Sequence, residues 1–212
     1  MLSIADIRKE YKMRSLAEAD VAADPFAQFS SWWEEAIASN VEEVNAMTLA
    51  TADAAGRPSA RIVLLKGMNE GGFEFFTNYE SHKAKEMEFN EHVALVFFWK
   101  ELERQIRIEG SVSKLPEQLS DAYFLTRPES SRIGAWASPQ SHTIPSREVL
   151  EEKVTEVKKR FQGKEVSRPP FWGGYIVQPR MIEFWQGRPN RLHDRIAYVH
   201  ETGGWVKKRL AP

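Results

Sequence analysis

The spacing of apolar positions along the chain predicts mostly strands. Apolar residues at every second position, or in short runs bounded by turn residues, occur over residues 47–52, 60–65, 73–77, 93–99, 105–115, 173–178, 181–186, 194–199 and 205–209. Helices are only inserted between these runs and do not alternate with them. The pattern therefore predicts a mainly β protein with flanking helices, closed as an antiparallel barrel instead of a βαβ sheet.

Capping residues indicate where the helices begin. Asp24 and Pro25 have the identities of an N-cap and a first helical residue, so a helix is expected from there to about Ser39. Further helices are predicted over residues 81–90, 116–126, 128–136 and 147–162, with a loop at 137–146. Residues 4–20 are charged and only loosely patterned. We therefore predict a mobile N-terminal arm over residues 1–20 and one domain over residues 21–212.

Composition narrows the class of protein. Apolar residues make up 42% and charged residues 28% of the 212 residues, which is typical of a globular chain. The net charge of −1 argues against a dedicated nucleic-acid binder. The chain has no cysteine, no signal-peptide pattern and no apolar run of membrane-spanning length. We therefore expect a cytoplasmic protein without nucleic-acid or membrane partners.

Several common catalytic signatures are missing. The sequence has no GxGxxG after a strand, no GxxxxGK[ST] and no GxSxG. Its five histidines lack zinc-ligand spacing, so no metal is predicted.

One candidate site lies near the C-terminus. If residues 191–195 are extended, Arg191, His193 and Arg195 project to one side, near Trp185. Two guanidinium groups and an imidazole beside an indole suit a planar, anionic aromatic ligand. A solvated strand face explains the same spacing.

Other candidates suit a phosphate group. Ser81-His82-Lys83 at a helix start combines a cation with free backbone N–H groups. Arg61 and Lys66 bracket an apolar strand, and their odd spacing sends them to opposite faces, toward two different anions. Ordinary helix capping and solvated strand ends are the alternatives.

Two helices supply a further set. Tyr123, Arg127 and Ser131 recur every four residues and converge if the helix junction at Pro128 brings them together. On the strand at 105–115, Gln105 shares a face with Arg107 and Glu109, where its amide suits a heterocycle. A solvated helix end and a bond to Glu109 or water are the alternatives.

Many short segments, in order, resemble the pyridoxamine 5'-phosphate oxidase family. They are Arg8 to Tyr11, Arg61 to Lys66, Phe76 to Asn78, Ser81 to Lys83, Glu103 to Gln105, Arg127-Pro128, Gly134 to Ser138, Gln140-Ser141, Phe171 to Gly174, Glu183 to Gly187, Arg191 to Arg195 and Arg209 to Pro212. The resemblance spans nearly the whole chain. It implies an FMN-binding split β-barrel that forms a homodimer with FMN at the subunit interface.

The resemblance also implies site residues. FMN would contact Arg61, Ile62, Val63, Leu64, Leu65, Lys66, Phe76, Thr77, His82, Lys83 and Gln105, completed by Gln140, Ser141, Trp185 and Arg195, some of them from the partner chain. The substrate phosphate would be held by Lys66, Tyr123, Arg127 and Ser131, and Arg191 and His193 would lie over the pyridine ring as the catalytic pair. Arg8 and Tyr11 would close the pocket.

Two positions depart from the family pattern. His82 stands where the family usually has arginine, and a neutral imidazole does not replace a permanent bidentate charge. Phe76 stands where tyrosine is frequent. Both changes are expected to affect FMN binding and not the reacting carbon.

The implied activity is oxidation of pyridoxamine and pyridoxine 5'-phosphates to pyridoxal 5'-phosphate, with oxygen as acceptor and hydrogen peroxide as product. Two alternatives stay open. Another split-barrel flavoprotein, such as an FMN reductase, needs the FMN set but not Tyr123, Arg127 and Ser131. A non-catalytic carrier of FMN or pyridoxal phosphate binds its ligand without flavin bleaching.

Overall fold

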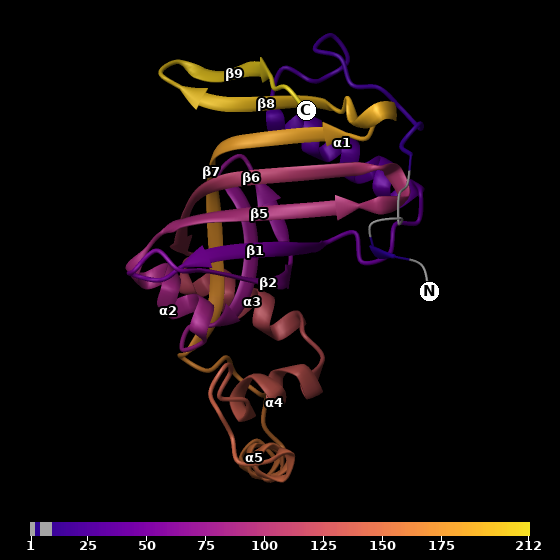
Figure 1. Cartoon of the computed structure of the whole chain (residues 1–212). Helices are drawn as coiled ribbons and strands as arrows, with labels where there is room; N and C mark the ends of the chain where they lie inside the picture. Colours follow the sequence, from indigo (N-terminus) through magenta and orange to yellow (C-terminus); the bar gives the residue numbers. More distant parts are fainter. Residues whose placement is uncertain (1–2, 5–9) are drawn as a thin grey trace. The chain divides into compact units, whose positions relative to one another are not determined.

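The computed structural model describes residues 3–4 and 10–212, whose strands form a sheet with helices around it (Figure 1). The strands are β1 (Ala46–Ala52), β2 (Pro58–Leu64), β3 (Gly67–Asn69), β4 (Gly72–Asn78), β5 (His92–Trp99), β6 (Arg104–Lys114), β7 (Trp172–Gln186), β8 (Asp194–Glu201) and β9 (Gly204–Arg209). The helices are α1 (Pro25–Ala38), α2 (His82–Phe89), α3 (Glu117–Thr126), α4 (Glu129–Ala137) and α5 (Arg147–Arg160). The predicted class, mainly β with flanking helices, is confirmed.

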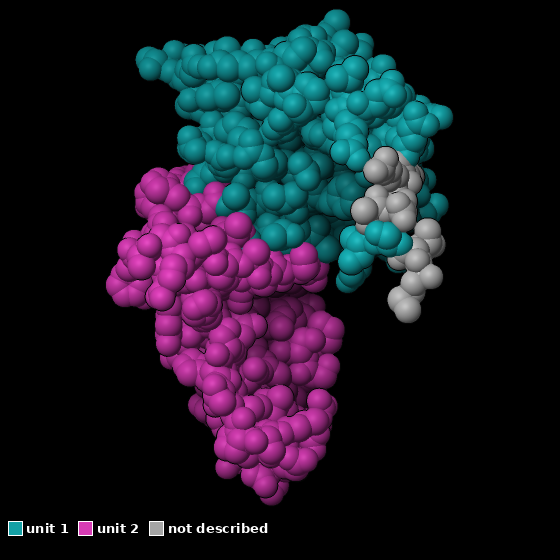
Figure 2. Space-filling model, in the orientation of Figure 1, with its two compact units in different colours: residues 1–49, 94–110, 179–212 teal, residues 50–93, 111–178 magenta. Residues whose placement is uncertain are grey.

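The strand order within the described residues is β2-β1-β5-β6-β7-β4-β3, with β8 on β7 and β9 on β8. The pairings β3–β4, β4–β7, β7–β8 and β8–β9 are antiparallel. The chain divides into two compact units, shown in Figure 2. Unit 1 holds residues 1–49, 94–110 and 179–212, and unit 2 holds residues 50–93 and 111–178. Strands β1, β5, β6 and β7 contribute residues to both units.

Unit 1 is built around aromatic side chains. Helix α1 begins where predicted, because the Asp24 carboxylate accepts a hydrogen bond from the Ala27 N–H (2.7 Å) and proline occupies the first turn. The helix buries Phe29 and Trp32, and the Trp32 ring meets Phe184 of β7 edge-on at 5.2 Å. Burial of these large rings supplies the apolar area that holds the unit together.

Unit 2 packs α3 and α4 against the start of β7. Phe124, Ile133, Val166 and Trp172 form its buried cluster. In the β4–β7 ladder, Phe76 lies opposite Gly174, where a Cβ atom would come within 2.7 Å of the Phe76 ring. A glycine there lets the Phe76 ring lie against the strand.

Two predicted strands, 173–178 and 181–186, are one strand, β7. Pro179 indicates a boundary between two strands, because proline lacks the backbone N–H that donates hydrogen bonds within a sheet. In the structure, pairing with β4 ends at Val177 and pairing with β8 begins at Met181. Pro179 lies between them, where no hydrogen bond is required on that side. The short strand β3 was not predicted.

Candidate active site

A cavity of about 830 Å³ opens in unit 2. We call it the basic cavity. It is lined by Ser59, Ala60, Arg61, Ile62, Val63, Leu64, Lys66, Phe76, Thr77, His82, Lys83, Tyr123, Arg127, Pro128, Ser131, Gln140, Ser141 and Trp172. Strands β2 and β4, the start of α2, the α3–α4 junction and the loop at 140–141 supply most of them. Among the described residues that line it there is no carboxylate. The volume and the charge suit a phosphate-bearing ligand of cofactor size.

Arg61 is held in place by groups on its own unit. Its guanidinium donates to the hydroxyls of Thr51 and Ser59 and to Glu86 Oε2 (3.1 Å). Burial alone raises the pKa of Glu86, but hydrogen bonds from Thr51 (2.6 Å) and Ser59 more than offset it, so that pKa lies below its ordinary value. An ionised, buried Glu86 therefore fixes the direction of Arg61.

Lys83 is a buried ammonium group on the cavity wall, with only 8% of the residue exposed. Among the described residues, all of its hydrogen-bond acceptors are neutral oxygens: Thr77 Oγ1 (3.2 Å), Ser81 Oγ (3.4 Å) and Gln140 Oε1 (3.4 Å). Burial, with a smaller contribution from Arg61, lowers the pKa of Lys83. A bound anion would compensate this charge.

The start of α2 differs in detail from the expectation. Ser81 is the N-cap residue, but its hydroxyl donates to the Asn78 carbonyl (2.7 Å) and makes no capping bond. The N–H groups of the first turn are therefore not capped by that side chain. His82 is exposed over 66% of its side chain, and its Nε2 lies 3.6 Å from Glu86 Oε1.

Aromatic rings form another wall of the cavity. Phe76 stacks on Tyr123 with ring centroids 3.9 Å apart, and Trp172 lies parallel at 5.6 Å from Phe76. The Arg127 guanidinium lies 4.5 Å above the Trp172 ring. Such a stack holds a guanidinium flat and leaves its edge for a ligand.

Arg127 is the least satisfied cation of this wall. Its buried NH1 atom has no hydrogen-bond partner among the described residues. Burial lowers the pKa of this guanidinium. Buried polar atoms are nearly always hydrogen-bonded, so an orphaned donor in a cavity points to a missing acceptor.

The predicted phosphate set comes together. All four of its residues line the basic cavity: Lys66, Tyr123, Arg127 and Ser131. Arg127 has an extended backbone between α3 and α4, so the chain turns before α4 begins after Pro128. Arg61 and Lys66 both line this cavity, as do the consecutive residues 59–64, which alternate between the two faces of β2. Strand β2 ends at Leu64, so strict alternation does not reach Lys66. The other unit 2 residues of the predicted FMN set line the cavity too, except Leu65, which is buried.

A second group of candidates lies in unit 1. The rings of Tyr11, Trp185 and His193, which we call the ring cluster, have centroids 4.5 Å apart for Trp185–His193 and 5.8 Å for Tyr11–Trp185. Tyr11 also lies on Gly187, where a Cβ atom would come within 2.7 Å of the tyrosine ring. Only glycine permits this close approach.

Residues 191–195 are not one extended segment, so the predicted row of side chains is wrong. Residues 189–191 form a short 3₁₀ turn in which Asn190 and Arg191 have φ of 57° and 62°. Strand β8 begins only at Asp194. Arg195 donates to Glu183 Oε1 (2.7 Å) and to the Ala211 carbonyl (2.9 Å). Arg191 is exposed.

The remaining candidates are placed as follows. Gln105 is half-buried on the predicted face of β6, beside Arg107, whose guanidinium bonds Glu183. Arg8 lies outside the described residues. The described residues hold no group of three potential metal-ligating side chains. None of their helices is both long and apolar enough to span a membrane.

Glu86 was missed by sequence reasoning. Its partners Thr51 and Arg61 lie 35 and 25 residues away, which no local pattern reveals. The available signal was its place four residues after His82 on the same helix, which puts both on one face.

His193 gives a pH prediction. Burial, and then the Arg191 cation, lower the pKa of His193 below its ordinary 6.5, and its Nδ1 accepts the Arg188 N–H (3.1 Å). The unfolded chain binds the proton more readily, so this group lowers stability as the pH falls through 6.5. We expect an NMR titration midpoint below 6.5 and a shallower acid limb of stability in His193→Gln. A midpoint at or above 6.5 would contradict this assignment.

The chain is similar in sequence to known proteins. The family profile "Pyridoxamine 5'-phosphate oxidase" matches residues 33–161, and "Pyridoxine 5'-phosphate oxidase C-terminal dimerisation region" matches residues 172–212. A Rubrobacter xylanophilus protein named pyridoxine/pyridoxamine 5'-phosphate oxidase is 55% identical, covering 99% of this chain and 96% of its own. A Ralstonia nicotianae protein named pyridoxine/pyridoxamine 5'-phosphate oxidase 1 is 57% identical, with both chains fully covered.

Solved structures show the same fold. PhzG from Burkholderia lata, crystallised with tetrahydrophenazine-1-carboxylic acid, has a TM-score of 0.89 and 28% identity, covering 96% of this chain and 100% of its own. A pyridoxamine 5'-phosphate oxidase-related, FMN-binding protein from Nostoc punctiforme has a TM-score of 0.70 at 16% identity, covering 91% and 100%. The second likeness concerns the fold alone.

Proposed function

This chain belongs to the pyridoxamine 5'-phosphate oxidase family, and from that premise we propose that it oxidises pyridoxamine and pyridoxine 5'-phosphates to pyridoxal 5'-phosphate with FMN as cofactor. The fold is the split β-barrel of that family. The observation that carries the assignment to phosphorylated substrates is the orphaned Arg127 NH1 in a cavity lined by cations. Oxygen is the proposed electron acceptor, and hydrogen peroxide the product.

The basic cavity fits the phosphate of FMN. Lys83 lacks a carboxylate partner among the described residues, and Arg61 is held beside it by Glu86. In this proposal, these cations and the exposed His82 hold the phosphate. The rest of the cofactor is flanked by the backbone from Arg61 to Lys66, by Phe76 and by the pair Gln140 and Ser141. Gln140 Oε1 already accepts from Thr77 (3.0 Å), which leaves its amide N–H₂ to donate.

The substrate phosphate is held at the other wall. Arg127 presents two parallel donors to it, Lys66 adds a second positive charge, and the hydroxyls of Tyr123 and Ser131 complete the set. The stack on Trp172 keeps the guanidinium fixed before the substrate arrives. Less motional freedom is then lost on binding.

The ring cluster completes the site in a homodimer. Trp185, Arg191, His193 and Arg195 all lie in the matched dimerisation region, residues 172–212. In our proposal a second copy supplies them, together with Tyr11, to the basic cavity of the first. Arg191 and His193 lie over the pyridine ring, and the neutral His193 orients the ring oxygen.

The chain contributes positioning and electrostatics to the reaction. When bound, FMN would supply the two-electron oxidation chemistry at C4' of the substrate, with oxygen as the proposed final acceptor. Lys66 and Arg127 fix C4' by clamping the phosphate. Arg191 stabilises the negative charge of the ring 3-oxygen. Water then releases ammonia from the imine that the amine substrate leaves.

Anaerobic reduction tests this proposal. Pyridoxamine 5'-phosphate is added to the FMN-loaded protein without oxygen, and the flavin's visible absorbance is followed. Bleaching that reverses on admission of oxygen supports the oxidase. Reduction by a nicotinamide donor but not by the phosphorylated vitamer would favour a reductase. A flavin that stays oxidised with both would favour a carrier.

The exposed His82 gives a prediction about cofactor affinity. His82→Arg adds a permanent charge beside the proposed phosphate, so the Kd for FMN is expected to fall about fivefold, in the range of exposed charge contacts. Fluorescence titration with FMN measures this. Unchanged affinity would place the phosphate away from residue 82.

A further inference from the structure

Glu103 joins two segments of unit 1 that are far apart in sequence. Its carboxylate Oε2 accepts the backbone N–H groups of Lys12 (2.9 Å) and Met13 (3.1 Å). Its carbonyl oxygen accepts the Gly187 N–H (2.7 Å) and the Gln186 side-chain amide (3.2 Å). One buried residue, 3% exposed, thus holds the N-terminal segment and the end of β7 together.

The segments that Glu103 joins carry the ring cluster. Lys12 follows Tyr11 directly, and Gly187 is the residue on which the Tyr11 ring lies. Trp185, which meets Tyr11 edge-on, is two residues before Gly187. The position of Tyr11 against Trp185 and His193 therefore depends on both ends of Glu103.

The backbone of Glu103 adds an independent sign. Its φ of 54° and ψ of 39° lie in the left-handed region, which glycine adopts without strain and glutamate does not. A strained residue that persists in a well-packed place is a reason to look for a function of its side chain. The only group that glutamate adds over glycine here is the side chain that ends in the carboxylate bound to Lys12 and Met13.

We propose that Glu103 is a positioning residue that fastens the N-terminal segment so that Tyr11 stays against Trp185 and His193. This role in catalysis rests on the proposed function, because the ring cluster is where the pyridine ring is proposed to lie. Glu103 itself touches no substrate. It acts through Tyr11.

Glu103→Gly is the sharpest variant, because glycine suits the left-handed backbone and keeps the carbonyl contacts to Gly187. We expect thermal stability to be retained. Hydrogen exchange of the Lys12 and Met13 amides, followed in the FMN-loaded protein, is expected to be faster by about tenfold or more. Glu103→Gln keeps an acceptor oxygen and should restore most of the protection.

Kinetics give the second measurement. The KM for pyridoxine 5'-phosphate is expected to rise about fivefold in Glu103→Gly with a smaller change in kcat, and to recover in Glu103→Gln. Glu101→Gln is the matched control, since Glu101 lies in the same short turn with an exposed side chain and should change neither quantity. A merely structural role would not produce this split together with the rescue.

The outcomes separate the two proposals. Unchanged exchange at Lys12 and Met13 in Glu103→Gly would overturn the clamp. Faster exchange with an unchanged KM would overturn its role in positioning for catalysis. If the unmodified protein fails to oxidise phosphorylated vitamers, the proposed function fails, while hydrogen exchange still decides whether Glu103 holds the segment.

Discussion

Replacing Arg127 by alanine is expected to raise the KM for pyridoxine 5'-phosphate about a hundredfold. Two charge-assisted hydrogen bonds to the phosphate are removed, each contributing roughly 1.5–3 kcal/mol; at the lower value their sum is about 3 kcal/mol, which is on the order of a hundredfold in affinity. The guanidinium stacked 4.5 Å above Trp172, with NH1 unpartnered among the described residues, is the group that the phosphate would satisfy. Steady-state kinetics with phosphorylated and unphosphorylated vitamers measure the effect.

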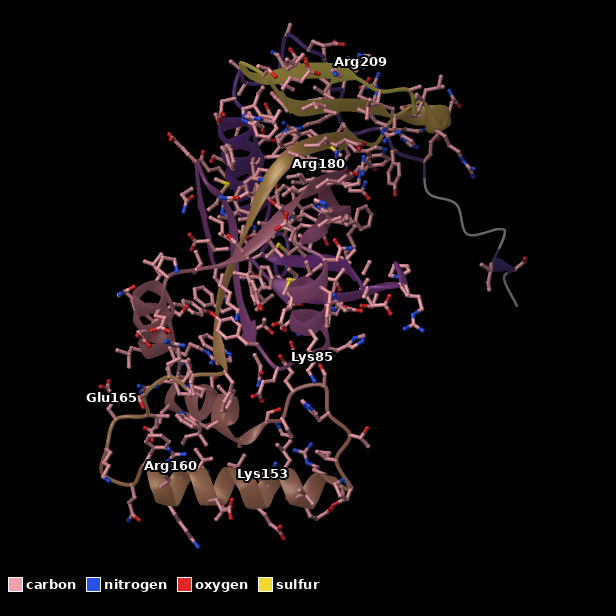
Figure 3. The ribbon with its side chains drawn as sticks, turned by 90° about the vertical axis from the view of Figure 1, so that its left-hand side faces the viewer. Lys85, Lys153, Arg160, Glu165, Arg180 and Arg209 are labelled. Carbon is pink, nitrogen blue, oxygen red and sulfur yellow. The ribbon has the colours of Figure 1, made fainter. Side chains whose placement is uncertain are left out.

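Three comparisons make this result specific. Arg127→Lys keeps the charge but not the planar fork, so it should recover only part of the loss. Arg160→Ala is the matched control: Arg160 lies on α5 (Figure 3), its guanidinium is 4.5 Å above the ring of Trp136, and it does not line the basic cavity. Unphosphorylated pyridoxine should be used equally poorly by the unmodified protein and by Arg127→Ala. An unchanged KM would place the substrate phosphate elsewhere.

Replacing Lys83 by methionine is expected to weaken FMN binding about a hundredfold while leaving the cofactor-free protein as stable as before or more so. The ammonium group is buried, and its neutral partners Thr77, Ser81 and Gln140 do not balance its charge. Burial of that charge, which lowers the pKa of Lys83, opposes folding without an anion. A bound phosphate would reverse the sign of its contribution.

Thermal denaturation with and without FMN measures both halves of this prediction. The melting temperature of the cofactor-free variant should equal or exceed that of the unmodified protein, and the increase on adding FMN should be smaller. Lys85→Met is the matched control, because Lys85 lies on the same helix with its side chain exposed (Figure 3) and does not line the cavity. If Lys83→Met binds FMN normally, the phosphate lies elsewhere.

Local patterns predicted the elements whose causes are local. Asp24 and Pro25 specify the start of α1 by themselves, and alternation along β6 places Ile106 in the core and Gln105 on the other face. Spacing alone favoured a solvated helix end for Tyr123, Arg127 and Ser131, and only the family resemblance implied a shared phosphate site; all three line the basic cavity.

Features set by distant contacts were not predicted correctly. Pro179 looks like a strand break unless the partners on either side, β4 and β8, are known. Arg191 adopts φ of 62°, which its sequence neighbours gave no reason to expect from an arginine. The carboxylates of Glu86 and Glu103 find their partners 25 to 91 residues away. Their importance depends on packing that periodicity does not encode.

The cations that line the cavity also bear on the release of the product. Substrate and product differ only at C4' and carry the same phosphate, so every contact to the phosphate that binds the substrate also binds the product. If Arg127 and Lys66 hold this phosphate as proposed, tighter binding by them would lengthen the residence time of the product, and product release would then limit the rate. In a cell, another phosphate-recognising protein that accepts the aldehyde directly would relieve this limit. On the proposed assignment, the charges that bind the substrate therefore make the turnover rate depend on how fast the product is removed.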